Sequence, residues 1–312
     1  MRRILIVQAK GFAMKKFLTL LFAICLMSIA HSAQAAGALS AYADGVWMNH
    51  IFGTAYTPVS TVYLALSTSA SLTNAATGAS MSEVANSNGY AREAITFGAA
   101  SARAITQNAT VTFPQASGSW GTVQGWCIVD SGTYGSGNVL AFGQFTASFS
   151  PVSGNIASIA SGQVVVSVNS SSNSRGWTTY LADKMLGLMF ADTAYSQPAT
   201  YVVIENTAAT DASTTCTGEV TGTGYSRTLV NKVGGSSPAW GTISSGDSSN
   251  ANAISWSCGS AWTQINGVAI CDASSSGNTL MYDSNTTDVP QQTPPSGDTV
   301  QFATSALAVS MQ

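Results

Sequence analysis

The chain contains one sequence pattern twice, and this internal repeat limits its possible folds more than any other feature. The matching pairs occur in the same order in both copies: 54–56 with 193–195, 89–92 with 224–227, 120–130 with 262–272, 137–140 with 277–280, and 153–169 with 296–312. Colinear matches at a nearly constant spacing indicate a duplicated unit. We therefore expect two homologous domains, 37–169 and 175–312, joined by a short polar linker at 170–174.

Each unit is expected to begin with a helix and to continue as β-strands. Apolar residues recur at helical spacing near the start of both units: Leu39, Tyr42, Val46 and His50 in the first, and Trp177, Leu181, Met185 and Leu188 in the second. Segments rich in β-branched and aromatic residues follow, such as 61–66 and 200–204, with Gly, Ser, Asn or Pro between them. The pattern predicts an all-β fold of two tandem β-sandwich or jelly-roll-like domains, each with a short N-terminal helix.

Residues 1–35 have the pattern of a secretory signal peptide. Met14, the expected translation start, is followed by two lysines, a continuous apolar stretch at 17–30, and small residues at the two positions of 33–35 that a signal peptidase reads. An N-terminal membrane anchor is the alternative, but the stretch is shorter than the roughly 20 residues that span a bilayer. We expect export through the periplasm to the cell surface or the medium, with no transmembrane span in the mature chain.

The low charge of the chain excludes several classes of protein. Only 8% of the residues are charged, against roughly 25% in an average globular protein. Five of the eleven Lys and Arg residues lie in the first sixteen positions, so the expected mature chain has six basic and fourteen acidic residues. No basic face remains for nucleic acid, and the sequence has neither a phosphate-binding loop nor a zinc-ligand cluster. We expect no cofactor, no metal and no nucleic-acid partner.

Several segments of the first unit carry a resemblance to a known family: 53–68 (GTAYTPVSTVYLALST), 89–98 (GYAREAITFG), 109–132 (ATVTFPQASGSWGTVQGWCIVDSG), 137–145 (GNVLAFGQF) and 159–168 (IASGQVVVSV). On these segments, residues 39–169 closely resemble a family of small phage tail-fibre-like domains. The second unit keeps only a skeleton of this pattern. The resemblance implies a structural or virion-associated role, and it brings no catalytic residues.

Few residues are candidates for catalysis. His50 is the only histidine after the predicted leader, and its place on the apolar stripe of a predicted helix favours a core or interface histidine over a catalytic one. The acids could supply a carboxylate pair for glycoside hydrolysis. The best candidates recur in both units: Asp44 and Asp183 on the predicted helices, and Asp130 and Asp272 after the strand that follows the tryptophan. Asp130 and Asp272 are followed by small turn-forming residues, so a turn role is favoured over catalysis or calcium binding.

Arg92 and Arg227 recur after Gly-Tyr in the two units. In a chain with so few charges, we expect each arginine to have a fixed carboxylate or carbonyl partner.

Three tryptophans are candidates for a binding surface: Trp120 and its counterpart Trp262, and Trp126 on the same predicted strand as Ile128. A role in the hydrophobic core is favoured, and a glycan platform or a subunit contact are the alternatives.

Four cysteines remain after the predicted leader, an even number that suits an oxidising compartment. We predict a disulfide between Cys216 and Cys258, and buried thiols at Cys127 and Cys271; disulfides between subunits are the alternative.

These observations favour a non-enzymatic, secreted structural protein, a subunit of an extracellular filament, tube or surface assembly whose main partner is another copy of itself. Interface cores are depleted in charged residues, and the chain is poor in them. The alternatives are an adhesin or glycan-binding module that contacts a surface glycan, and a phage or prophage tail-associated receptor-binding protein.

Overall fold

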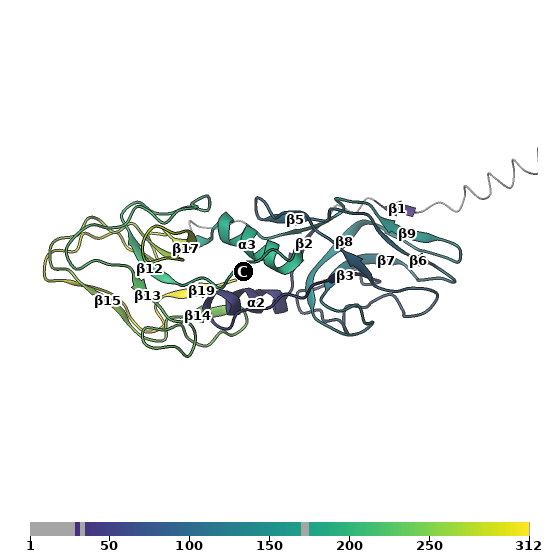
Figure 1. Ribbon diagram of the computed structural model, residues 1–312, viewed down its shortest axis with the longest axis horizontal. Helices are drawn as coiled ribbons and strands as arrows, with labels where there is room; N and C mark the ends of the chain where they lie inside the picture. The colour runs from purple at the N-terminus through teal and green to yellow at the C-terminus, as the bar shows by residue number, and fades with distance from the viewer. Residues whose placement is uncertain (1–28, 32–34, 170–174, 312) are drawn as a thin grey trace, which may run out of the picture.

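The computed structural model describes residues 29–31, 35–169 and 175–311 (Figure 1). The predicted leader lies outside these residues except for 29–31 and Ala35, and the predicted linker at 170–174 lies outside them entirely. Figure 1 shows the strands of the two units at opposite ends of the molecule, with two helices between them. We call the two units repeat 1 and repeat 2.

In the described residues, repeat 1 has one helix and nine strands, and a tenth strand, β1, comes from the predicted leader; these strands form two sheets. Its elements are β1 (Ile29–His31), β2 (Ala35–Leu39), α2 (Ala41–Phe52), β3 (Val62–Ser67), β4 (Glu93–Ile95), β5 (Ala104–Thr106), β6 (Val111–Gln115), β7 (Val123–Val129), β8 (Val139–Phe149), β9 (Ile156–Ile159) and β10 (Val164–Ser167). The larger sheet has the order β4-β3-β7-β8-β2-β10-β5, and the smaller has the order β1-β9-β6. Buried residues of both sheets belong to one hydrophobic core.

Repeat 2 uses the same strand pairing with fewer strands. Its elements are β11 (Arg175–Trp177), α3 (Thr179–Phe190), β12 (Tyr201–Glu205), β13 (Thr228–Leu229), β14 (Asp247–Ser249), β15 (Ile254–Ser257), β16 (Gly267–Cys271), β17 (Thr279–Asp283), β18 (Thr299–Phe302) and β19 (Ala308–Ser310). The order β12-β16-β17-β11 repeats the order β3-β7-β8-β2, and β19 pairs with β14 as β10 pairs with β5. The predicted all-β fold with one short helix at the start of each unit is confirmed.

The two repeats differ in how their sheets close. In repeat 1, β2 pairs with β8 on one side and, in parallel, with β10 on the other, so seven strands form one sheet. In the described part of repeat 2, β11 pairs with β17 only and β19 pairs with β14 only. The sheet of repeat 2 is therefore split between β11 and β19.

Both helices begin at a hydroxyl side chain that also bonds to the sheet. The Ser40 Oγ accepts from the amide of Ala43 and donates to the carbonyl of Val139, and the Thr178 Oγ1 accepts from Leu181 and donates to Thr279. Such caps satisfy amides that the helix itself leaves unpaired. Each helix is thereby fixed against its own sheet.

These caps also correct one expected match between the repeats. Asp44 is the fourth residue after its cap, and Asp183 is the fifth after its own. The two aspartates do not occupy equivalent positions, so they are not a duplicated acid.

Candidate functional site

The Gly-Tyr-x-Arg motif of repeat 1 forms a buried polar cluster that we call the Arg92 clasp (Arg92, Glu83 and Tyr90). The guanidinium group of Arg92 donates to both Glu83 carboxylate oxygens at 2.8 Å, and the Tyr90 hydroxyl donates to the same carboxylate at 3.0 Å. Arg92 also donates to the carbonyls of Ser131 and Ser136 at 2.7 and 2.8 Å. The Arg92 and Glu83 side chains are 0% and 4% exposed, so the clasp ties three loops together inside the protein.

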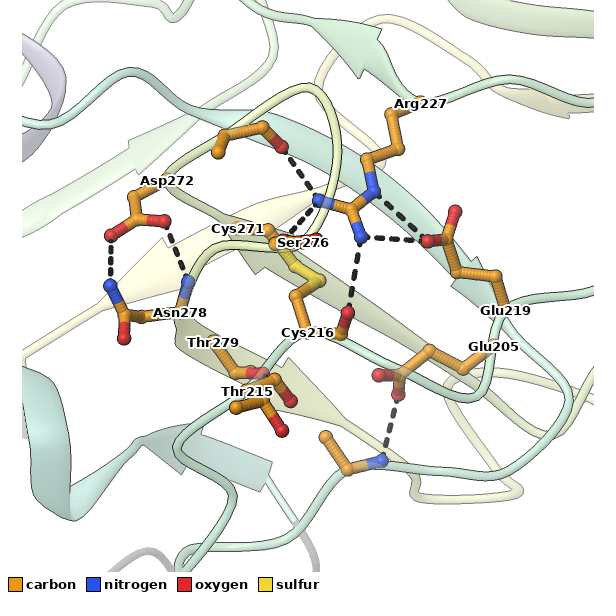
Figure 2. Close-up of a disulfide and its surroundings, with 12 residues drawn as sticks. Glu205, Thr215, Cys216, Glu219, Arg227, Cys271, Asp272, Ser276, Asn278 and Thr279 are labelled. Atoms are coloured by element: carbon orange, nitrogen blue, oxygen red, sulfur yellow. Dashed lines mark hydrogen bonds and ion pairs between the residues drawn. A yellow bond between two sulfur atoms is a disulfide. The ribbon is translucent and has the colours of Figure 1, made fainter.

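Repeat 2 builds the same cluster, which we call the Arg227 clasp (Arg227, Glu219 and Tyr225). Figure 2 shows its Arg227 and Glu219 beside the disulfide. Arg227 donates to Glu219 at 2.7 Å and to the carbonyls of Ala273 and Ser276, and the Tyr225 hydroxyl donates to Glu219 at 2.6 Å. The Glu219 side chain is 26% exposed, much more than Glu83. The predicted fixed partners of both arginines are confirmed.

The cysteine pairing differs from the predicted one. Cys216 is bonded to Cys271, and Cys258 and Cys127 are buried free thiols. Cys271 lies on the strand β16 opposite Tyr201, next to the loop that holds Cys216, whereas Cys258 follows β15 in a separate two-stranded sheet. The prediction of a Cys216–Cys258 disulfide and of a free thiol at Cys271 is therefore wrong.

Asp130 and Asp272 close a loop in each repeat. The Asp130 carboxylate accepts from the amide and side-chain nitrogens of Asn138 at 2.6 and 2.8 Å, and Asp272 accepts from Asn278 in the same way. The glycine before each asparagine has a positive φ, and a Cβ there would come within 2.5 Å of the aspartate oxygen. The turn role is confirmed, and both oxygens of each carboxylate accept a hydrogen bond within the loop.

The three candidate tryptophans lie in the core. Trp120 and Trp262 are 5% and 2% exposed, and their indole nitrogens donate to the carbonyls of Asn88 and Thr223. Trp126 is 0% exposed. None of the three rings has a free face, so the core role holds and these residues form neither a glycan platform nor an exposed subunit contact.

The two repeats meet at what we call the junction, formed by α2, α3 and the strands β5 and β14 (Figure 1). The helix α2 packs against β14 of repeat 2, and α3 packs against β5 of repeat 1. The ring of Phe52 lies 4.5 Å from that of Trp240, and the ring of Phe190 lies 5.5 Å from that of Phe97. Because equivalent residues exchange contacts, the junction is an approximate two-fold, self-complementary interface.

Arg103 breaks this symmetry with a set of bonds from repeat 1 into repeat 2. Its amide donates to the Asp183 carboxylate at 2.8 Å, and its guanidinium group donates to Asp211 and to the carbonyls of Asn169 and Trp177. The arginine is 6% exposed and has a positive φ of 64°. Sequence reasoning missed Arg103, because it belongs to no motif and its partners are distant in the chain.

His50 lies in the junction, as a core or interface histidine should. It is 2% exposed, its Nδ1 accepts from the amide of Tyr56 at 3.1 Å, and its ring lies beside that of Tyr195. Burial and the nearby Lys232 lower the pKa of His50. Burial lowers the pKa of Lys232 itself to about 8, while its ammonium donates to the carbonyls of Ile51 and Pro198.

Among the described residues, no group of three or more His, Cys, Asp or Glu side chains is placed to hold a metal ion. A membrane-crossing helix is likewise not found in the described part of the chain. The polar residues that recur in both repeats hold loops together through hydrogen bonds and ion pairs. Their role is therefore structural.

A family model described as podophage GP4 fiber I protein gp80 matches residues 38–167 and, separately, residues 176–310. The two matches follow the two repeats and confirm the resemblance to phage tail-fibre-like domains. No curated protein matches the chain.

Proposed function

Because the chain belongs to the family of the podophage GP4 fiber I protein gp80, we propose that this phage tail-fibre-like structural protein is an assembling subunit of an extracellular filament, tube or surface layer. The proposal gives it a non-enzymatic role, with other copies of the same chain as its main partner.

One observation carries the proposal: the charged and polar residues that recur in both repeats bond to other residues of the same chain and hold its loops in place. Arg92, Arg227, Asp130 and Asp272 are bonded within their own repeats, and Arg103 joins the two repeats. A subunit that is mainly scaffold suits a load-bearing assembly. Its surface can then form contacts through Ser, Thr, Asn and Ala, which avoid the cost of desolvating charge.

The export step of this proposal rests on the signal-peptide pattern at 1–35. Mass spectrometry of the protein purified from the producing cells is expected to find an N-terminus at Ala36. Recovery of the chain with Met1 or Met14 at its N-terminus would contradict export by this route and would favour a virion component.

Electron microscopy of the native material tests the assembly step. Ordered filaments, tubes or sheets are expected, and they should persist at low protein concentration. A monodisperse monomer under all conditions would contradict the proposal, because an assembling subunit must self-associate.

The phage or prophage receptor-binding alternative requires that the leader is not translated as a signal peptide, so the N-terminus of the purified protein tests it. The adhesin or glycan-binding alternative loses the residues that suggested it. Trp120, Trp126 and Trp262 are buried, so a glycan-binding role would need another site.

A further inference from the structure

A cavity of about 370 Å³ lies between β11 and β19 of repeat 2, and Arg103, Val168 and Asn169 of repeat 1 also line it. Val268, Ile270 and Met281 contribute apolar wall, and Arg175 and Asp283 contribute charged wall. Pockets for small molecules prefer domain interfaces and run from roughly 300 to 1,000 Å³. The place and the size of the cavity therefore suit a small ligand.

Repeat 1 fills the equivalent space with its own indole ring. Trp126 lies over Gly37 of β2 and Gly143 of β8, so closely that a Cβ at these glycines would come within 2.2 and 2.5 Å of ring atoms. Trp126 and Gly143 are cross-strand partners, and the far edge of β2 is paired with β10. The indole therefore covers a closed sheet and leaves no opening there.

Repeat 2 replaces this arrangement with a valine and two charged residues. Val268 is the cross-strand partner of Asp283, and Asp283 is the partner of Arg175. Arg175 stands three residues before its helix cap, as Gly37 does before Ser40. With the indole gone and the sheet split, the space is open and has polar side chains in its wall.

The edge of β19 adds backbone groups to this wall. The amides of Leu307 and Met311 bond toward β14. Neighbouring residues of an antiparallel strand point their N–H and C=O groups to opposite sides, so Ala308 and Ser310 direct theirs toward β11. The Trp177 indole nitrogen reaches across and donates to the Ser310 carbonyl at 3.0 Å.

The charges around the cavity are largely compensated within the protein. Arg103 is paired with Asp211, and Arg175 is paired with Asp288. Asp283 accepts through one oxygen from the amide of Asn285 at 2.8 Å. An anionic ligand would have to compete with Asp211 or Asp288 for an arginine that is already paired, whereas a neutral ligand with both donors and acceptors would not.

We propose that this cavity binds a neutral polyhydroxylated ring, a saccharide unit. Its C–H face packs on Val268, Ile270 and Met281, and its hydroxyls bond to Asp283, Arg175 and the β19 edge. Adjacent hydroxyls each donate and accept, so they match a carboxylate beside a guanidinium group. The site lies apart from the three buried tryptophans, and the proposal does not depend on assembly into a filament.

The test is a titration of the full chain, labelled with ¹⁵N at its tryptophan indoles, with D-glucose, D-galactose and N-acetyl-D-glucosamine. A Trp177→Phe variant identifies the Trp177 signal. Addition of at least one sugar is expected to shift that signal and to leave the Trp120 signal unchanged, since Trp177 lines the cavity and Trp120 does not.

Two further arms make the result decisive. Asp283→Ala is expected to weaken sugar binding by about tenfold or more, the equivalent of about 1.4 kcal/mol, with partial recovery in Asp283→Asn. The matched control Asp298→Asn, at an exposed acid that does not line the cavity, should bind as the unaltered chain does.

No shift with any of the sugars would overturn the proposal. A Trp177 shift with indole or with inorganic phosphate but with none of the sugars would overturn the ligand class. A sugar-induced shift that is equal in Asp283→Ala and in the unaltered chain would show that the carboxylate does not recognise the hydroxyls. Each of these results leaves the filament proposal to its own test.

Discussion

The two repeats hold the same arginine clasp by different means. In repeat 1 the Arg92–Glu83 pair is almost fully buried and the neighbouring core is built from noncovalent packing, with Val129 and Cys127 as unlinked side chains. In repeat 2 the Arg227–Glu219 pair is more exposed, and a disulfide lies beside it. Cys271, opposite Tyr201, stands where Val129 stands opposite Tyr63. The comparison shows that the more exposed of the two arginine–glutamate clusters is the one that has a disulfide beside it.

The largest effect is expected from removal of the buried arginine. Arg92→Ala should lower the free energy of unfolding by about 3–5 kcal/mol, because it leaves the Glu83 carboxylate buried without its partner. Urea unfolding followed by tryptophan fluorescence measures the change. Arg175→Ala is the matched control, since the Arg175–Asp288 pair is half exposed and should be worth about 0–1 kcal/mol. Equal losses in the two variants would show that burial does not set the strength of the clasp.

Removal of the disulfide should rank next. The double variant Cys216→Ala with Cys271→Val gives repeat 2 the residue of repeat 1 at position 271, and it should cost about 2–4 kcal/mol, because it frees a loop of 55 residues in the unfolded chain. Calorimetry with and without a reducing agent measures it. Cys127→Ala with Cys258→Ala removes the two free thiols and keeps the disulfide, so this control should lose stability on reduction as the unaltered chain does. The variant without Cys216 and Cys271 should be insensitive to the reducing agent. A double variant as stable as the oxidised chain would mean that repeat 2 does not need the link.

The junction gives a third contrast, since Arg103 and Gly246 occupy equivalent places before β5 and β14. Arg103→Gly should cost about 2–3 kcal/mol, because it removes charge-assisted hydrogen bonds to Asp211 and to two carbonyls. It should also separate the unfolding of the repeats into two calorimetric transitions. A single unchanged transition would show that the aromatic contacts alone couple the repeats.

The smallest effect is a pH dependence specific to repeat 2. Glu205 replaces Ser67 of repeat 1 at the same strand position, and burial raises its pKa to about 7. Because the folded state holds this proton more tightly, stability is fully present below the unfolded pKa of about 4.5 and is lost as pH rises through 7, by roughly 2 kcal/mol between pH 5 and 8. Thermal unfolding at several pH values measures the slope, which Glu205→Gln should flatten. An unchanged slope in that variant would assign the dependence to other groups.

The repeat, the helices and the main strands could be predicted because each depends on a pattern in the sequence: matching segments, apolar residues at helical spacing, and stretches of β-branched and aromatic residues. The stretch 61–66 corresponds to β3 and 200–204 to β12, and the recurring Gly-Tyr-x-Arg motif correctly indicated fixed partners for both arginines. These features depend on neighbours in the sequence or on a comparison between the two copies.

The strand order, the disulfide and the junction depend on contacts between distant segments. Cys216 pairs with Cys271 because the strand β16 brings that residue to the loop, and spacing along the chain does not reveal which strand lies nearest. Arg103 bonds to Asp211, 108 positions away. The same limit applies to the cavity between β11 and β19, since only the split sheet exposes it.

The reciprocal junction has a further consequence for how the molecule forms. Two separate chains that met through such a surface would associate only above their dissociation constant, so their pairing would depend on dilution. Here the two repeats are joined by a predicted linker of five residues, 170–174, and a short linker holds its two ends at an effective concentration of the order of millimolar. Duplication of the unit within one chain thus converts a dimerisation equilibrium into a folding step. The paired form can then persist at protein concentrations far below those that a separate dimer would need.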